Sequence, residues 1–417
     1  MTKRRVLLIH HSGLFGGAGL SLLDLWQHLE REYEVTALIP ESPPDLRDIL
    51  LARGYEAKTF PGRLGKLPYY SGGESLLRPR FWYYFMLTIM QRGRWKRIIE
   101  REGPEIVVVN SGVLCWMVKV MTGVVSICYV RETMRGRPTS LINRYLRRLR
   151  DKFDAVCYLS EYDLAQDKLG SATQLLVPDA VDPVHFSMTF DRREACEQLG
   201  VSTRPFNVLY LGGASVLKGY DQMLRVAKYL RGVDIQVIMA GYLGPSRRRW
   251  GLVRGPGRRR ADRELAELAN ELEAEGVTRS TGIVPDVRVA YAACDVVVFP
   301  MREPHQARPA FEAGFQGKPI IISGFQNVRG CVEHGVNGLL FRPGDERDLA
   351  RAILMIASNP VELERMGAEN RRHALARHSR DSAFEELNRF LRGTWGRGRE
   401  LRGTGRPGED GFGDMEK

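Results

Sequence analysis

The sequence predicts an α/β protein with two domains, each built on an open parallel β-sheet. Its 417 residues are too many for one ordinary hydrophobic core. Short apolar strands alternate with helical segments along the chain, and a glycine-rich turn follows a strand in both halves. The hydrophobic content of 43% is that of a globular protein. We therefore expect domains at residues 1–183 and 184–392, with the alternative that the C-terminal helix packs back on the first domain, and a disordered, glycine-rich and charged tail at 393–417.

The N-terminal half contains several expected strands, and polar residues follow three of them directly. The strands cover residues 5–10, 106–109, 124–129, 155–159 and 175–177. Asn110, Arg131 and Ser160 each stand just beyond one of these strands. Ligands of open parallel sheets bind beyond the carboxyl ends of the strands. This edge of the sheet is therefore the predicted ligand side of the domain.

The first strand leads into a glycine-rich turn that includes Gly16 and Gly17, and Ser21 is the expected N-cap of the next helix. The full G-x-G-x-x-G fingerprint of a dinucleotide site is absent. Two interpretations stay open: a loop that faces a ligand, and a tight turn only. His10 and His11, at the end of the strand, are interpreted as satisfied strand-end residues.

The C-terminal half carries the more specific pattern. An expected strand at 208–211 runs into a glycine turn that ends with Lys218, and a second strand at 296–299 runs into a polar loop. A helix then opens at Pro309, a residue suited to the first helical position, and carries Glu312 in its first turn. A further strand at 320–322 follows Gly-Lys-Pro. Strand, loop and helix N-terminus predict an anion site with a carboxylate beside it.

These motifs resemble the retaining glycosyltransferases of family 4, which have the GT-B fold of two Rossmann-like domains facing across a cleft. The family motif is Glu, seven residues, Glu, then Ala, a short apolar turn and Gly-Lys-Pro. Glu312 matches the second Glu, which implies that it binds the ribose of a nucleotide-sugar. Lys218 matches the lysine that holds the diphosphate. The resemblance covers about residues 4–390 and is stronger in the second half.

The chain departs from the family pattern at two positions. Pro304 stands where the first Glu of the motif belongs, and Glu303 lies one residue too early. Either Glu303 still reaches the sugar, or His305 takes its place. Gly213 stands where the family has an arginine for the diphosphate, and Arg308 could replace the missing cation.

The resemblance implies a metal-independent transfer of a sugar from a nucleotide-sugar donor to a glycan or lipid-linked acceptor, with no cofactor and no D-x-D metal motif. The implied catalytic residues are Lys218, Glu303 and His305, and the implied donor-binding residues are Gly16, Gly17, Gly213, Arg308 and Glu312. An altered, non-catalytic subunit that acts as a scaffold in glycan assembly is the alternative. A nucleotide-sugar epimerase of similar fold is disfavoured by the Glu-Ala and Gly-Lys-Pro pattern.

The net charge of +12 is concentrated in three basic stretches, at residues 247–263, 78–101 and 144–152. Such stretches bind anionic surfaces, and many members of the resembled family act on lipid-linked acceptors at a membrane. Nucleic acid is not an expected partner because no recognised nucleic-acid module accompanies the charge. Six scattered cysteines, no signal peptide and no apolar run of membrane-spanning length predict a cytoplasmic protein, peripheral on the inner face of the membrane.

Overall fold

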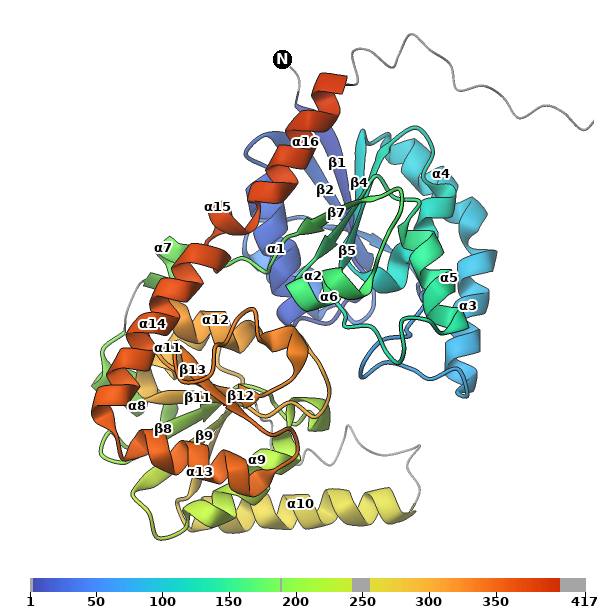
Figure 1. Cartoon of the computed structure of the whole chain (residues 1–417). Coiled ribbons are helices and arrows are strands. Elements are labelled where there is room, and N and C mark those ends of the chain that lie inside the picture. The colour runs from blue at the N-terminus through green and yellow to red at the C-terminus, as the bar shows by residue number, and fades with distance from the viewer. Residues whose placement is uncertain (1–2, 188–189, 242–255, 398–417) are drawn as a thin grey trace, which may run out of the picture.

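The computed structural model describes residues 3–187, 190–241 and 256–397, and these form two α/β domains (Figure 1). The N-terminal domain contains a seven-stranded parallel sheet in the order β3-β2-β1-β4-β5-β6-β7. Its strands are β1 (Arg4–Ile9), β2 (Tyr33–Pro40), β3 (Lys58–Phe60), β4 (Ile106–Val109), β5 (Val125–Val130), β6 (Ala155–Tyr158) and β7 (Thr173–Leu176).

The C-terminal domain repeats this plan with a six-stranded parallel sheet in the order β10-β9-β8-β11-β12-β13. Its strands are β8 (Phe206–Tyr210), β9 (Ile235–Ala240), β10 (Thr278–Gly282), β11 (Val296–Phe299), β12 (Ile320–Ser323) and β13 (Gly338–Phe341).

Both faces of each sheet are buried, which explains why the central strands are continuously apolar. In β4, Ile106 and Val108 join the core on one face, whereas Val107 and Val109 join the core on the other. The strands of parallel sheets are apolar on both sides because helices cover both faces of the sheet.

The helices of the N-terminal domain are α1 (Gly17–Leu29), α2 (Asp45–Ala52), α3 (Pro79–Met90), α4 (Arg92–Glu102), the 3-10 helix η1 (Gly112–Val120), α5 (Leu141–Arg150) and α6 (Glu161–Gln166). Helix α1 begins earlier than expected. Gly16 is its N-cap, and Ser21 lies inside the helix and donates a hydrogen bond to the Gly17 carbonyl at 2.9 Å. The predicted N-cap at Ser21 is therefore wrong.

The later helices are α7 (Pro183–Ser187), α8 (Arg192–Leu199), η2 (Val216–Lys218), α9 (Tyr220–Ala227), η3 (Lys228–Leu230), α10 (Pro256–Ala274), α11 (Val287–Ala293), α12 (Arg308–Phe315), η4 (Gln326–Val328), α13 (Glu346–Ala357), α14 (Pro360–His378), α15 (Arg380–Ala383) and α16 (Glu385–Arg397). Figure 1 shows α14, α15 and α16 running from the C-terminal domain back along the N-terminal one.

The end of the chain belongs to the N-terminal core. Phe384, Leu387 and Leu391 pack among the residues of α1 and β1. Helix α16 continues to Arg397, so the expected disorder from residue 393 is wrong for the start of the tail. Residues 398–417, which make up the rest of the predicted tail, lie outside the described residues.

Each sheet has one point at which the strand order reverses, and these points locate the ligand side. The reversal lies between β1 and β4 in the N-terminal sheet and between β8 and β11 in the C-terminal sheet. At such a switch point the connections leave in opposite directions, which opens a crevice beyond the carboxyl ends of the two strands. The switch points therefore mark where each domain can receive a ligand.

Candidate active site

Residues that follow both switch points line a single cleft of about 470 Å³ between the domains. Six of the eight predicted site residues are on its walls: Gly16, Gly17, Lys218, His305, Arg308 and Glu312. Glu303 and Gly213 are not among the lining residues.

Lys218 is the cation of the C-terminal wall. It is the last residue of η2, the first helical element after β8, and is half-buried. Burial lowers the pKa of its amine. Among the described residues, no carboxylate forms an ion pair with it. His305 lies nearby on the cleft wall, where desolvation and the charge of Lys218 lower the pKa of the imidazole. Lys218 is thus free to meet an anion.

Glu303 makes a different contact from the one the motif implies. Its carboxylate accepts hydrogen bonds from the Gly72 amide at 2.5 Å and the Ser71 hydroxyl at 3.2 Å. Both partners lie in the loop between β3 and α3 of the N-terminal domain. The structure therefore brings His305, and not Glu303, to the cleft beside Lys218. Which of the two serves the sugar stays a prediction.

Arg308 is already engaged by carboxylates. It donates to Asp24 at 2.9 Å across the domain interface and to Glu312 at 2.6 Å on its own helix. Burial opposes its charge, but the two carboxylates outweigh this effect and raise the pKa of the guanidinium. Ser21 accepts a further hydrogen bond at 3.3 Å. Arg308 joins the two domains in this structure, and its expected role on the diphosphate stays a prediction.

Glu312 lies deeper in its helix than expected. Because α12 begins at Arg308, Glu312 is one turn further in rather than in the first turn. Its carboxylate accepts from the Tyr291 hydroxyl at 2.8 Å as well as from Arg308. Burial raises its pKa against the opposing charge of Arg308. The carboxylate borders the cleft with a fixed orientation.

Gly213 is not among the residues that line the cleft, and its backbone conformation disfavours the arginine that the family has there. Its φ is +57°, a conformation that side chains with a Cβ rarely adopt. A Cβ at this position would lie 2.9 Å from the Gly241 carbonyl oxygen. The local backbone favours glycine over the family's arginine.

Gly16 and Gly17 place the positive end of a helix in the cleft. The amides of Gly19 and Leu20 bond back to the Gly16 carbonyl, so the helix hydrogen-bond ladder starts only there. The amides before them lack a partner within the helix, and the helix dipole adds a partial positive charge. This end of α1 suits a phosphate or another anion.

The N-terminal wall contains a network that the sequence interpretation missed. Arg131, after β5, donates to Asn110 at 2.7 Å and to Asp179 at 2.5 Å. Asn110 contacts the Nδ1 atom of His10 at 3.0 Å. His10, Arg131 and Asp179 all line the cleft. The sequence had indicated Asn110 and Arg131 as polar residues at strand ends, but it did not connect them with His10 or Asp179.

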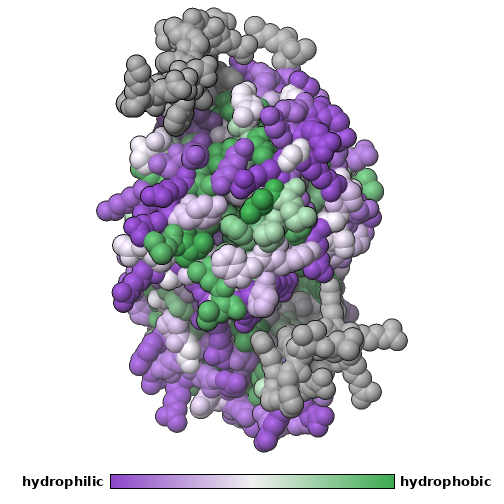
Figure 2. Space-filling model, turned by 90° about the vertical axis from the view of Figure 1, so that its right-hand side faces the viewer, coloured by the Kyte–Doolittle hydropathy of each residue, from purple (hydrophilic) through white to green (hydrophobic). Residues whose placement is uncertain are grey.

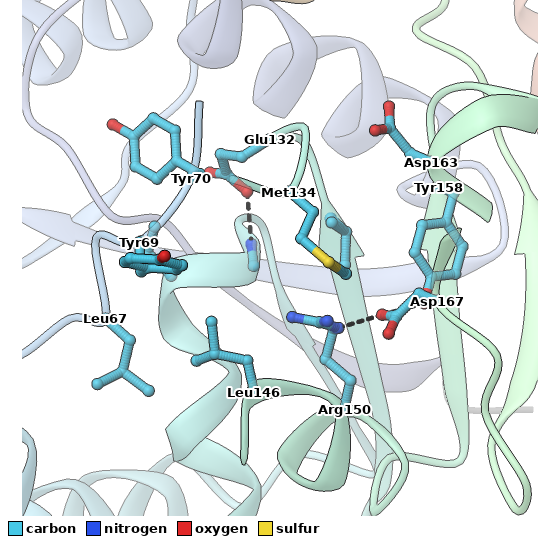
Figure 3. Close-up of a pocket in the computed structure, with 13 residues that line it drawn as sticks. Leu67, Tyr69, Tyr70, Glu132, Met134, Leu146, Arg150, Tyr158, Asp163 and Asp167 are labelled. Carbon is cyan, nitrogen blue, oxygen red and sulfur yellow. Dashed lines mark hydrogen bonds and ion pairs between the residues drawn. The ribbon is translucent and has the colours of Figure 1, made fainter. Parts of the chain in front are cut away.

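A smaller pocket opens in the N-terminal domain on the other side of β5 and β6 (Figure 3). Its free space of about 30 Å³ holds roughly two water-sized groups. Arg150, paired with Asp167, and the carboxylates of Glu132 and Asp163 line it. Asp163 is 5% exposed, accepts from Gln306 of the C-terminal domain at 3.2 Å, and has one oxygen without a hydrogen-bond partner. Burial raises its pKa to about 6.

Comparison with known proteins finds a similarity that is confined to the C-terminal half of the sequence. Residues 191–373 match the family model of glycosyl transferases group 1. Relatives include the D-inositol 3-phosphate glycosyltransferase of Rhodococcus jostii (strain RHA1), 33% identical over 190 residues, which are 44% of this chain and 40% of that protein. The same enzyme of Geodermatophilus obscurus is 31% identical over 211 residues, 48% of this chain and 43% of that protein. The chain spans about two-fifths of the length of these curated relatives. Over the matched segment the chain is similar to the glycosyl transferases of group 1.

Solved structures extend the likeness to both domains. Anabaena Alr3699/HepE in complex with UDP-glucose superposes with a TM-score of 0.72 at 19% identity, over 93% of this chain and 99% of that one. Sucrose-phosphate synthase from Thermosynechococcus elongatus gives a TM-score of 0.69 at 17% identity, over 94% and 100%. The predicted GT-B fold, with two Rossmann-like domains across a cleft, is confirmed.

Proposed function

We propose that this protein is a retaining, metal-independent glycosyltransferase. It moves a sugar from a nucleotide-sugar to a glycan or lipid-linked acceptor, in the synthesis of a cell-surface polysaccharide or glycolipid. The observation that carries the proposal is the cleft between two switch points, where Lys218 has no anionic partner among the described residues. The similar fold of Alr3699/HepE, solved with UDP-glucose, supports a nucleotide-sugar as the donor.

The proposed chemistry follows from charge. Negative charge builds on the diphosphate as the glycosidic bond breaks, and fixed positive groups stabilise it most when water is excluded. Lys218 supplies one such group, and the first turn of α1 at Gly16 and Gly17 supplies backbone N–H groups. Glu312 holds the ribose, and His305 or Glu303 contacts the transferred sugar.

A scaffold role in glycan assembly is the second candidate, and the contacts of two residues favour it. Arg308 donates hydrogen bonds to Asp24 and Glu312, and Glu303 accepts a hydrogen bond from the loop between β3 and α3. In a catalytic cycle, both residues would have to give up these contacts in order to contact the nucleotide-sugar.

The membrane is the proposed location of the acceptor. Helix α3 exposes apolar side chains on its outer face, and arginines flank it at both ends. Figure 2 views this side of the molecule and shows apolar surface among hydrophilic surroundings. The exposed side chains of the helix are Trp82, Tyr83, Met86, Ile89 and Met90, and Leu77 is exposed just before it. An apolar stripe with basic flanks suits an anionic bilayer surface.

The other two basic stretches carry less of this argument. Residues 242–255 of the first stretch lie outside the described residues. In the 144–152 stretch, Arg147 and Arg150 turn inward onto Asp167. Among the described residues, no helix is long and apolar enough to cross a bilayer. A cytoplasmic protein on the inner face of the membrane is thus part of the proposal.

A thermal-shift panel tests the donor class, with UDP-glucose, UDP-N-acetylglucosamine and GDP-mannose against the matching free nucleotides. A donor at a hundredfold excess over its Kd should stabilise the protein by about 2.7 kcal/mol. Release of nucleoside diphosphate on addition of acceptor, unchanged in EDTA, is the expected enzymatic result. Donor binding without any turnover supports the scaffold, and the absence of any shift contradicts both candidates.

A further inference from the structure

His10 and Asn110 are adjacent at the N-terminal switch point. Strands β1 and β4 pair in parallel with Ile9 opposite Val109, so the next residue of each strand stands beside its counterpart. Neither His10 nor Asn110 has any exposed surface. Their side chains meet at 3.0 Å through Nδ2 of the amide and Nδ1 of the imidazole.

The hydrogen bonds around Asn110 fix the proton on His10. The Nε atom of Arg131 can only donate, and it bonds the Asn110 side chain at 2.7 Å, so the atom that it meets is the carbonyl oxygen. The amide nitrogen of Asn110 must then point to His10 as a donor. Nδ1 of His10 therefore accepts and carries no hydrogen. In a neutral imidazole this leaves the hydrogen on Nε2.

The surroundings keep this imidazole neutral. Burial, and then the electrostatic effect of His11 and Arg131, lower the pKa of His10 well below its ordinary value. Asp179 holds the Arg131 guanidinium on its other side at 2.5 Å, which anchors the whole chain of contacts. The Nε2 atom of His10 is buried and has no hydrogen-bond partner among the described residues, although His10 lines the cleft. A buried donor without a hydrogen bond is unfavourable, and a bound ligand can supply the missing acceptor.

We propose that His10 contacts the substrate, and that its Nε2–H group donates a hydrogen bond to an uncharged oxygen of the sugar in the cleft. This inference rests on the proposed function and names a further residue of the same site. The two walls of the cleft differ in charge, and this difference indicates that His10 faces the sugar and not the diphosphate. Lys218 offers a full positive charge to the diphosphate, whereas the charge of Arg131 behind His10 is balanced by Asp179. A neutral donor matches a hydroxyl.

The first test compares sugar-nucleotide with free nucleotide, using calorimetry on the full chain with UDP-glucose against UDP and GDP-mannose against GDP. His10→Phe should weaken the sugar-nucleotide that binds the wild type by roughly threefold to tenfold, as for one neutral hydrogen bond. Its affinity for the free diphosphate should not change. His10→Gln, which keeps an N–H donor, should restore part of the loss.

His28→Phe is the matched control. His28 is also a buried histidine that contacts an asparagine, Asn388 at 2.8 Å, but it is not among the residues that line the cleft. It should leave both affinities unchanged.

A second test changes the proton and keeps the histidine. Asn110→Asp still accepts from Arg131 but presents an oxygen to Nδ1, so the hydrogen of His10 should move to Nδ1. Nitrogen NMR of histidine-labelled protein should show Nε2–H in the wild type and Nδ1–H alone in the variant. Sugar-nucleotide binding should fall as in His10→Phe. Asn110→Asp also serves if His10→Phe does not fold.

The possible outcomes distinguish a failure of this inference from a failure of the proposed function on which it rests. If no sugar-nucleotide binds the wild type, the proposed function fails and the inference with it. If the wild type binds and His10→Phe binds equally well, only the inference fails. Equal losses for sugar-nucleotide and free nucleotide would place His10 on the diphosphate and overturn the assignment to the sugar.

Discussion

The two switch points have the same backbone plan and opposite electrostatics. At the N-terminal one, Arg131 is balanced by Asp179, and His10 presents a neutral group to the cleft. At the C-terminal one, Lys218 faces the cleft without an ion pair among the described residues. A satisfied network holds a neutral donor in place whether or not ligand is bound. An unpaired cation instead attracts an anionic group of a ligand. The two walls are therefore suited to different parts of one ligand.

The interdomain contacts show a second asymmetry. Three side chains of the loop and helix start after β11 reach different parts of the N-terminal domain. Glu303 meets the loop between β3 and α3, Gln306 meets Asp163, and Arg308 meets Asp24. This segment both lines the cleft and joins the domains. Its contacts provide ways to test which residues hold the fold and which serve the ligand.

The largest expected effect is on stability, at the Arg308 pair. Asp24→Asn should lower the free energy of unfolding by about 3–5 kcal/mol, because it leaves a buried guanidinium short of one carboxylate. Arg260→Ala, which breaks an exposed pair with Glu264, should cost less than about 0.5 kcal/mol. Urea unfolding of both variants measures the difference. Equal effects would show that Arg308 does not join the domains in solution.

Asp163 should make stability depend on pH, with a total effect of roughly 3 kcal/mol. Its folded pKa is raised from 3.8 to about 6, so between these values the folded state binds a proton that the unfolded chain has lost. Stability should therefore fall as pH rises through this window, by about 1.4 kcal/mol for each step of one in pH. Asp163→Asn should lack this fall. The free energy of unfolding of the variant, relative to that of the wild type, should therefore be higher at pH 7.5 than at pH 4. Parallel stability curves for the two proteins would contradict the raised pKa.

Lys218→Ala should lower turnover by about a hundredfold, the scale for one preorganised contact that strengthens in the transition state. The matched control is Lys228→Ala, an exposed lysine one helix further along. Steady-state kinetics with the donor found by the panel give both values. An unchanged kcat/KM in Lys218→Ala would contradict the proposed role of Lys218 on the diphosphate and, with it, the electrostatic difference between the two walls.

The comparison of Glu303 with His305 should give a smaller and asymmetric effect. His305→Ala should lower kcat roughly tenfold, because its ring lies on the cleft wall beside Lys218. Glu303→Gln should mainly loosen the contact with Gly72 and Ser71, which small-angle scattering would show as a more open molecule. If Glu303→Gln instead loses kcat while His305→Ala does not, Glu303 moves into the cleft during turnover.

The last expected effect is at the membrane. Replacing Trp82 and Met86 with serine should weaken binding to vesicles of phosphatidylglycerol, by about 1–3 kcal/mol per apolar side chain at most. Rising salt should weaken it further through the flanking arginines. Co-sedimentation measures both, with Val361, exposed on α14, changed to serine as the control. Equal pelleting with neutral lipid would argue against this surface.

Sequence alone located several elements of this fold because their signals are local. The strand 296–299 is apolar throughout, and the glycines after β1 and β8 stand where parallel strands meet ligands. Strands with weaker patterns were not expected, among them β2, β9 and β13. Lys218, His305 and Glu312 were named from motif spacing, and all three line the cleft.

The tertiary structure alone decided what these side chains touch. Arg308 and Asp24 are 284 positions apart, and Glu303 and Ser71 are 232 apart, so no spacing rule connects them. The proton on His10 depends on Arg131 through Asn110, residues of three different strands. Motif spacing records which side chains share a turn of backbone. Ion pairs and proton positions depend on distances in space, which exist only once the two sheets have folded and faced each other.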